Sequence, residues 1–352
     1  MASTIRAAAL AIMLVGCGSP QFDRVERDLV PPQAPGHPVR WEKDLGRAVN
    51  LSPVPYKDGW IIPLVNNSIQ FLRGDTGEVL WKKKLSSPPF DATLVGAGLL
   101  VVATDLPKED LRALSPEDGS TVWNVEREGG HLATNATDLV VIRRNGVVSR
   151  RDLSSGAALW EQNLRGAGWR GAHLLQASVL IPVRPDSLVA LDLETGKRLW
   201  AREVGDWPHV TGSDPVVTFS DQGLLTLMDA QTGKTIRERE LEGIPTGPPQ
   251  VDQNHVLLSL TKGTVTMLKL SDLSPHWEQT LDAPLVSPPA VHGDLVLQSG
   301  AKGGVTVMDW RTGKTETELW HREKLFVSPV SSKAGILVAG SHGRLICYGS
   351  HR

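Results

Sequence analysis

The 352-residue sequence predicts an all-β fold, one β-propeller of eight four-stranded blades built from about residues 39–350. A motif that contains Gly and Trp recurs at intervals of 37 to 42 residues, which is the length of one four-stranded blade. Apolar, β-branched runs lie between the copies, and no segment of the body has the i, i+3, i+4 pattern of an amphipathic helix. A segment near the N-terminus also matches the one strand that the C-terminal repeat lacks.

Each copy of the motif is a tight turn followed by a strand that carries tryptophan. The clearest copy runs from Asp192 through Thr195 and Gly196 to Trp200. Glycine adopts a positive φ without steric cost, and Asp or Thr side chains hydrogen bond to nearby backbone, so these residues suit a hairpin turn. Equivalent turn residues are Thr76, Gly77, Thr232, Gly233, Thr312 and Gly313, and the tryptophans at this spacing are Trp41, Trp81, Trp123, Trp160, Trp200 and Trp277.

The two ends of the chain are expected to share a blade. Residues Val327–Tyr348 contain the first three strands of an eighth repeat and then stop. The segment Val39–Leu45 resembles the segments around Trp81 and Trp160, so it supplies the missing tryptophan-bearing strand. Closure of the ring by this strand would remove two unpaired sheet edges. We therefore predict that the N-terminal strand completes the last blade.

The N-terminal residues predict a lipid anchor followed by a tether. Arg6 precedes an apolar run of about nine residues, which is too short to span a bilayer but suits a signal peptide over residues 1–17. The run ends at Leu14-Val15-Gly16-Cys17, which resembles a bacterial lipobox. We expect lipidation of Cys17, with an ordinary signal peptide or a buried helix as the alternatives. Residues 18–38 contain five prolines and little apolar material, so we expect a flexible tether.

The pattern from Asp192 to Trp200 resembles the tryptophan-docking repeat of pyrroloquinoline-quinone-type propellers. That family includes quinoprotein dehydrogenases and BamB-like outer-membrane assembly lipoproteins. The resemblance implies that each repeat tryptophan packs against the neighbouring blade, so Trp200→Ala is expected to lower the melting temperature more than Trp60→Ala. Two repeats depart from the pattern, because Arg237 and Thr317 stand where tryptophan is expected; in the second case Trp320 follows three residues later. These two seams between blades are expected to be less regular.

The sequence offers no catalytic, cofactor-binding or metal-binding residues that we can assign. Its two cysteines, Cys17 and Cys347, are far apart, whereas the quinoprotein dehydrogenases typically carry an adjacent pair over the quinone. None of the ten histidines has metal-ligand spacing, and we interpret His131, His209 and His292, near blade starts, as loop residues rather than a channel site. With 37 basic and 39 acidic residues, the chain lacks the positive field of a nucleic-acid-binding protein.

The resemblance implies a scaffold rather than an enzyme. A BamB-like accessory lipoprotein, monomeric within a complex, would bind the barrel-forming component of the outer-membrane assembly machine through loops on one face. Candidate loops are Asp105–Asp110 and Gly205–Gly212, in which Trp207 is expected to be exposed. The pairs Arg143-Arg144 and Arg150-Arg151 predict a basic hairpin, which could meet an acidic partner or lipid headgroups but which we interpret as a solvated face.

The sequence also predicts where the protein is located, and it leaves two other functions open. No Asp follows Cys17, which by resemblance to Gram-negative lipoproteins implies sorting to the outer membrane, with the propeller on the periplasmic face. One alternative function is a quinoprotein-like enzyme or a small-ligand sensor that uses the central channel. Another is a propeller of the cell envelope that binds an unrelated protein.

Overall fold

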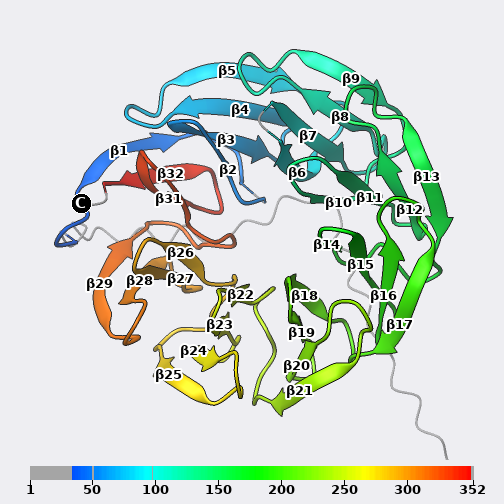
Figure 1. Ribbon diagram of the computed structural model, residues 1–352. Helices are drawn as coiled ribbons and strands as arrows, with labels where there is room; N and C mark the ends of the chain where they lie inside the picture. The colour runs from blue at the N-terminus through cyan, green and yellow to red at the C-terminus, as the bar shows by residue number, and fades with distance from the viewer. Residues whose placement is uncertain (1–33, 50, 97, 350–352) are drawn as a thin grey trace, which may run out of the picture.

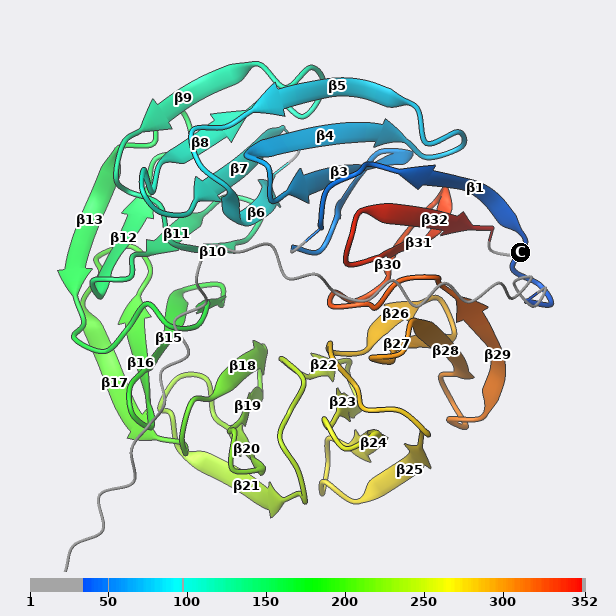
Figure 2. The same ribbon diagram turned by 180° about the vertical axis from the view of Figure 1, so that it is seen from behind.

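Eight four-stranded antiparallel sheets form a closed ring in the computed structural model (Figure 1). The structure describes residues 34–49, 51–96 and 98–349, and the view from behind shows the same ring, with the inner strands toward its centre (Figure 2). This arrangement confirms the predicted eight-bladed, all-β propeller. The predicted signal peptide, Cys17 and tether residues 18–33 lie outside the described residues. Within the described ranges, no helix could cross a membrane.

Each of the first seven blades uses four consecutive strands, running from the inner strand to the outer strand. The first four blades are β2 (Val54–Tyr56), β3 (Gly59–Leu64), β4 (Ser68–Arg73) and β5 (Val79–Lys84); β6 (Pro89–Val95), β7 (Leu99–Thr104), β8 (Leu111–Leu114) and β9 (Thr121–Val125); β10 (His131–Thr134), β11 (Leu139–Ile142), β12 (Val147–Arg151) and β13 (Ala158–Asn163); and β14 (His173–Leu174), β15 (Ser178–Val183), β16 (Ser187–Asp192) and β17 (Arg198–Glu203).

The remaining blades continue the ring, and the last one combines both ends of the chain. They are β18 (His209–Gly212), β19 (Val216–Phe219), β20 (Leu224–Met228) and β21 (Thr235–Glu240); β22 (Gln250–Val251), β23 (His255–Ser259), β24 (Thr264–Lys269) and β25 (Pro275–Thr280); β26 (Ala290–His292), β27 (Leu295–Ser299), β28 (Gly304–Asp309) and β29 (Thr315–Trp320); and β30 (Val330–Ser332), β31 (Gly335–Ala339), β32 (Arg344–Tyr348) and β1 (Val39–Asp44).

Burial within a blade follows the position of the strand. Every residue of β3 is buried, because blades cover both faces of the middle strands, and such strands have continuous apolar sequences. The outer strand β5 instead alternates, with Trp81 buried toward the next blade and Leu80 and Lys82 exposed. The apolar core is therefore a series of layers between adjacent blades.

The chain ends close the ring as predicted. Strand β1 pairs antiparallel with β32 and places Trp41 opposite Cys347, which gives the sheet order β1-β32-β31-β30 (Figure 1). Arg344 forms an ion pair with Glu42 across this pairing. The Nδ1 atom of His37 lies 3.1 Å from the carbonyl oxygen of Gly349, which ties the segment before β1 to the end of β32.

Six seams between blades have the same tryptophan–glycine contact. Trp81 Nε1 donates to the carbonyl of Pro116 at 2.9 Å, and the indole lies over Gly119 of the next blade. A Cβ atom at Gly119 would lie 2.7 Å from Trp81 Cε3, so a side chain does not fit there unless the indole moves. The six pairs are Trp41–Gly77, Trp81–Gly119, Trp123–Gly156, Trp160–Gly196, Trp200–Gly233 and Trp277–Gly313.

The two seams without a repeat tryptophan differ from these six in specific ways. Where Arg237 replaces tryptophan, Leu273 of the next blade replaces glycine; its side chain is 1% exposed in the core and its φ is +59°. Arg239 donates to the Leu273 carbonyl at 2.6 Å, so a buried leucine and an arginine hydrogen bond occupy this seam. Thr317 faces no hairpin turn, because the third and outer strands of the last blade, β32 and β1, come from opposite ends of the chain.

Trp60→Ala is unsuitable as a control that should destabilise the protein less than Trp200→Ala. The Trp60 side chain is fully buried on β3, and its ring packs against Trp41 with centroids 6.0 Å apart. The expectation that Trp60→Ala has a small effect has no support in this packing, because truncation of a fully buried indole leaves a large cavity.

Candidate protein-binding face

The loops of the ring emerge on two faces. Because consecutive strands are antiparallel, the loops between the second and third strands lie on the same side as the loops that lead to the next blade. We call this side the contact face; it comprises residues 45–49, 51–53, 65–67, 85–88, 105–110, 126–130, 143–146, 164–172, 184–186, 204–208, 220–223, 241–249, 260–263, 281–289, 300–303, 321–329 and 340–343. The opposite side, which we call the turn face, carries the Thr-Gly hairpin turns and the loops after the inner strands.

Large exposed apolar side chains are distributed unequally between these faces. Those in loops all belong to the contact face: Val65, Leu106, Trp169, Ile244 and Phe326. The others lie on strands, at Val39, Leu80, Val122, Leu159, Leu199, Ile236 and Val291, so within the described residues the loops of the turn face have none. This unequal distribution favours the contact face over the turn face as a surface for protein contacts. The contact face is therefore the candidate functional site.

Two indoles and an arginine form the most organised feature of the contact face, which we call the aromatic corner (Trp169, Arg184 and Trp207). The Trp169 and Trp207 rings are nearly perpendicular, at 80°, with centroids 6.2 Å apart. The guanidinium carbon of Arg184 lies 3.5 Å from the Trp169 centroid and 3.9 Å from the Trp207 centroid. Trp169 is 55% exposed and Arg184 is also exposed, whereas Trp207 is only partly exposed.

Backbone hydrogen bonds between three loops hold the aromatic corner in place. The amide of Arg184 donates to Gly166 at 3.1 Å, and the amide of Trp207 donates to Pro185 at 3.3 Å. Trp207 has a φ of +53°, a conformation that costs a bulky residue roughly 1–3 kcal/mol and persists only where the surrounding structure imposes it. The positions of the two rings are thus set before any partner binds.

Arg170 connects the aromatic corner to the next blade. Its Nη2 atom lies 2.7 Å from Asp221, and its Nη1 atom lies 2.6 Å from His209 Nε2. Burial and the adjacent Arg170 charge lower the pKa of His209 to about 3. His209 is therefore neutral at physiological pH and serves as a hydrogen-bond partner for the guanidinium.

The first loop that the sequence singled out, Asp105–Asp110, lies on the contact face, but of the second, Gly205–Gly212, only residues 205–208 do, because His209–Gly212 form strand β18. In the Asp105–Asp110 loop, Leu106 is exposed and Asp105 forms a 2.6 Å ion pair with Arg144, which stacks on Phe90. In the second loop, Trp207 is largely covered by its neighbours, so the expectation that it is exposed was wrong. The exposed indole is Trp169, which the repeat pattern does not predict because it lies outside the motif.

The predicted basic hairpin is neutralised by carboxylates. Arg151 pairs with Glu128 at 2.5 Å, and Arg143 pairs with the same residue at 2.7 Å. Arg150 lies 2.9 Å from Asp138 and 2.7 Å from Glu194 of the next blade. These ion pairs connect blades and leave little free positive charge for an acidic partner.

His131, His209 and His292 lie on the inner strands β10, β18 and β26 rather than in loops as expected, and they have separate surroundings. His131 packs against Phe90, with ring centroids 4.7 Å apart, and burial together with Arg144 lowers its pKa to about 4. Burial lowers the pKa of His292, and electrostatic interaction with His37 lowers it further. No group of three or more His, Cys, Asp or Glu residues suited to hold a metal ion is found in the part of the chain that the structure describes.

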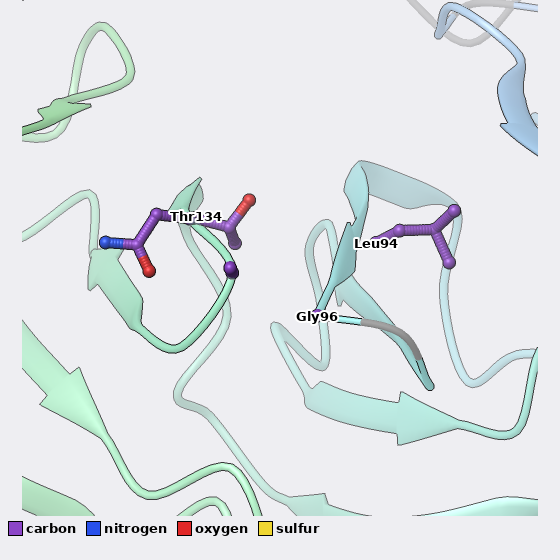
Figure 3. Close-up of a pocket in the computed structure, with 5 residues that line it drawn as sticks. Leu94, Gly96 and Thr134 are labelled. Carbon is purple, nitrogen blue, oxygen red and sulfur yellow. The ribbon is translucent and has the colours of Figure 1, made fainter.

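A cavity of about 520 Å³ opens on the turn face between the inner strands β6 and β10. Figure 3 shows Leu94 and Gly96 on one side of it and Thr134 on the other. Asn135 and Ala136 complete its lining, so no charged or titratable group faces it. The Thr134 hydroxyl already lies within hydrogen-bond distance of the Thr93 hydroxyl, at 3.2 Å, so the cavity offers few free polar groups to a specific ligand.

Comparisons with known proteins identify the family. The model of the family "Outer membrane protein assembly factor BamB" matches residues 34–168 and 221–349. BamB of Moranella endobia is 22% identical over 65% of this chain and 64% of its own length, and BamB of Burkholderia pseudomallei is 26% identical over 56% of this chain and 58% of its own length. These sequence matches thus span less than two thirds of each relative.

Solved structures share the fold. The crystal structure of BamB from Moraxella catarrhalis superimposes with a TM-score of 0.74 at 20% identity and covers 89% of this chain and 99% of that chain. A computationally designed protein, Ika8, reaches a TM-score of 0.76 at 14% identity, so likeness at this level establishes the propeller alone. The family model, in contrast, covers well over half of the sequence, and the chain therefore belongs to the family of the outer membrane protein assembly factor BamB.

Proposed function

We propose that this protein is a non-catalytic accessory factor in the assembly of outer-membrane β-barrel proteins, and that it acts by binding another protein through its contact face. Family membership supports the process, and the aromatic corner supports the mode of action. A closed ring whose blades are locked by buried indoles is a rigid platform. Trp and Arg at the centre of an exposed surface are the residue types that contribute most to protein–protein affinity.

The proposed partner is the barrel-forming component of the assembly machine. Trp169 offers an exposed aromatic surface that is already oriented, which lowers the entropic cost of binding. Leu106, Ile244 and Phe326 are further exposed apolar residues in other loops of the same face. The protein would act as a monomer within the complex and would use no cofactor.

A lipid on Cys17 would hold the propeller at the periplasmic side of the outer membrane. The proposal rests on the lipobox-like sequence that ends at Cys17. Mass spectrometry of the mature protein should find an acylated N-terminal cysteine, and Cys17→Ala should move the protein from the membrane fraction to the soluble periplasmic fraction. An unmodified N-terminus that begins at another residue would contradict the lipid anchor. It would not affect the proposal that the contact face binds a protein.

Crosslinked pull-down from bacterial envelopes tests the proposed function. The wild type should recover the barrel-forming component, and Trp169→Ala should lose most of that recovery. Leu199→Ala provides a matched control, because Leu199 is 52% exposed, close to the 55% of Trp169, but lies on the outer strand β17 away from the contact face. Equal recovery by both variants would reject the contact face as the docking surface, and recovery of an unrelated envelope protein alone would reject the proposed partner.

A further inference from the structure

Arg184 is an arginine whose side chain is positioned but whose charge is not paired. Two indoles hold its guanidinium at 3.5 and 3.9 Å. Among residues 34–49, 51–96 and 98–349, no carboxylate lies within ion-pair distance of it. Arg144 has the same kind of aromatic contact, at 4.7 Å from Phe90, but lies 2.6 Å from Asp105. Arg322, the third arginine over a ring on the contact face, lies farther away, at 5.7 Å from the Trp320 centroid, so Arg184 has the closest ring contacts and, unlike Arg144, no carboxylate.

The acidic residues nearest to Arg184 in the sequence and in the adjoining loops have other partners. Asp186 accepts a hydrogen bond from the Ser187 hydroxyl at 3.0 Å. Asp206 accepts one from Gln222 at 2.8 Å, and Asp221 pairs with Arg170 at 2.7 Å. The absence of a partner for Arg184 is thus not caused by a lack of carboxylates nearby, since the loops hold them in other contacts.

We propose that Arg184 binds a single Asp or Glu side chain of the partner protein, presented beside an apolar group that packs on Trp169. This inference rests on the proposed function, because it assigns the chemistry of the surface through which the partner docks. A guanidinium offers parallel N–H donors that match a carboxylate, and charge-assisted pairs of this kind are stronger than neutral hydrogen bonds. The contacts with the two indoles hold the side chain in place, which lowers the entropic cost of forming the pair.

The surroundings favour one carboxylate over an acidic segment. Asp186 and Asp206 lie in the contact-face loops 184–186 and 204–208, accept hydrogen bonds from the neutral Ser187 and Gln222 side chains, and would repel a run of negative charges. The exposed ring of Trp169 and the exposed Pro185 provide apolar surface beside the guanidinium. The partner feature that fits is therefore an isolated acidic residue flanked by apolar side chains.

Affinity measurements with matched variants test this assignment. The detergent-solubilised, full-length protein is titrated with the purified barrel-forming component, as wild type, Arg184→Gln and Arg144→Gln. Loss of a charge-assisted pair should weaken Kd for Arg184→Gln by about 10- to 100-fold. Arg144→Gln should remain within about twofold of wild type, since its charge is already paired within the chain. Added salt should weaken the wild type more than Arg184→Gln, an effect that a structural role for Arg184 would not produce.

A chemical crosslink identifies the partner residue and does not depend on a loss of binding. Arg184→Lys keeps the positive charge and adds a primary amine that a carbodiimide can join to an adjacent carboxylate. Mass spectrometry of the crosslinked complex should find position 184 joined to one Asp or Glu of the partner. Complexes that form without any crosslink at position 184 would overturn the assignment.

The outcomes separate this inference from the proposed function. If Arg184→Gln binds as the wild type does while Trp169→Ala loses binding, the corner is an apolar docking site, the proposed function stands and the carboxylate assignment is rejected. If the wild type does not bind the barrel-forming component, the proposed function fails and the assignment fails with it.

Discussion

The two faces of the ring differ in how strictly the repeat constrains their sequences. On the turn face, Asp192 accepts hydrogen bonds from the Thr195 amide at 2.7 Å and the Thr195 hydroxyl at 2.6 Å, and Asp229 and Asp309 bind Thr232 and Thr312 in the same way. The glycine that follows each threonine receives the indole of the preceding blade. The turn face therefore carries a repeated set of contacts that join the blades.

The contact face is repetitive only in its later blades, where equivalent backbone bridges join Pro245 to Leu260, Leu285 to Gly300 and Leu325 to Gly340. Its loops range from three residues (65–67 and 184–186) to nine (164–172, 241–249, 281–289 and 321–329), and the loops of the aromatic corner do not share these bridges. Trp169, Arg184 and Trp207 come together from three of these loops. The difference indicates a division of roles, with stability determined at the turn face and recognition at the contact face, as in other scaffolds that bind through loops.

The largest expected effect is on stability, from Trp200→Ala. Trp200 is 6% exposed, donates to the Ala230 carbonyl at 3.3 Å and covers Gly233. Truncation of such a buried indole should lower the free energy of unfolding by about 3–5 kcal/mol. Urea denaturation, monitored by circular dichroism, measures this change in the free energy of unfolding. Trp169→Ala, at the 55%-exposed indole, should change stability by less than about 1 kcal/mol, and equal losses for the two variants would contradict the division of roles.

Next in size are losses of stability at two equivalent turn positions, one caused by an added Cβ atom and the other by a removed side chain. A Cβ at Gly233 would lie 2.6 Å from Trp200 Cε3, and its φ is +64°, so Gly233→Ala should destabilise the protein by about 1–3 kcal/mol. At the equivalent position of the next blade, Leu273 is buried, so Leu273→Ala should cost about 2–3 kcal/mol by leaving a cavity. Both losses are measured by the same urea titration.

Both turn-face variants should bind the barrel-forming component with unchanged affinity, because neither residue lies on the contact face. If Leu273→Ala left the free energy of unfolding unchanged, the leucine would not fill the role of the indole at that seam. The interpretation of the irregular seam would then be wrong. A marked loss of affinity in a variant that is still folded would show that the faces are not independent.

The sequence was sufficient for the ring because the features that build it are local and repeated. The interval between turns gives the blade, and the similarity of the Trp41 segment to the Trp81 segment gives the closure. The irregular seam at Arg237 was visible only in part. The missing tryptophan is evident from the motif, but the leucine at position 273, where other repeats have glycine, compensates for it only in the folded ring.

The aromatic corner could not be predicted in the same way, because no period relates positions 169, 184 and 207. Their proximity depends on loops from neighbouring blades that meet only in the folded ring. One signal was available. Of the eleven tryptophans, six occupy repeat positions, and the five that remain are Trp60, Trp169, Trp207, Trp310 and Trp320. The two that lie in loops of the contact face form the corner, so tryptophans outside the motif were the residues to examine.

The smallest expected effect is a pH dependence that originates next to the aromatic corner. The pKa of His209 is lowered to about 3 in the folded protein, from an ordinary value of 6.5, by burial and by Arg170. The unfolded chain therefore binds a proton at this residue as pH falls below about 6.5, while the folded protein resists protonation until about pH 3. The contribution of neutral His209 to stability is complete above pH 6.5 and is lost progressively as the pH falls through this window.

Replacement by a neutral residue isolates this contribution. His209→Gln cannot be protonated, and its side-chain oxygen can still accept a hydrogen bond from Arg170. The free energy of unfolding of the wild type should fall more steeply between pH 6.5 and pH 4.5 than that of His209→Gln, although His131, with a pKa near 4, leaves a residual slope in both. Identical slopes would mean that His209 is accessible to protons in the folded ring. Arg170 would then stand beside a cation at mild acidity, and the corner would be less rigid than its contacts indicate.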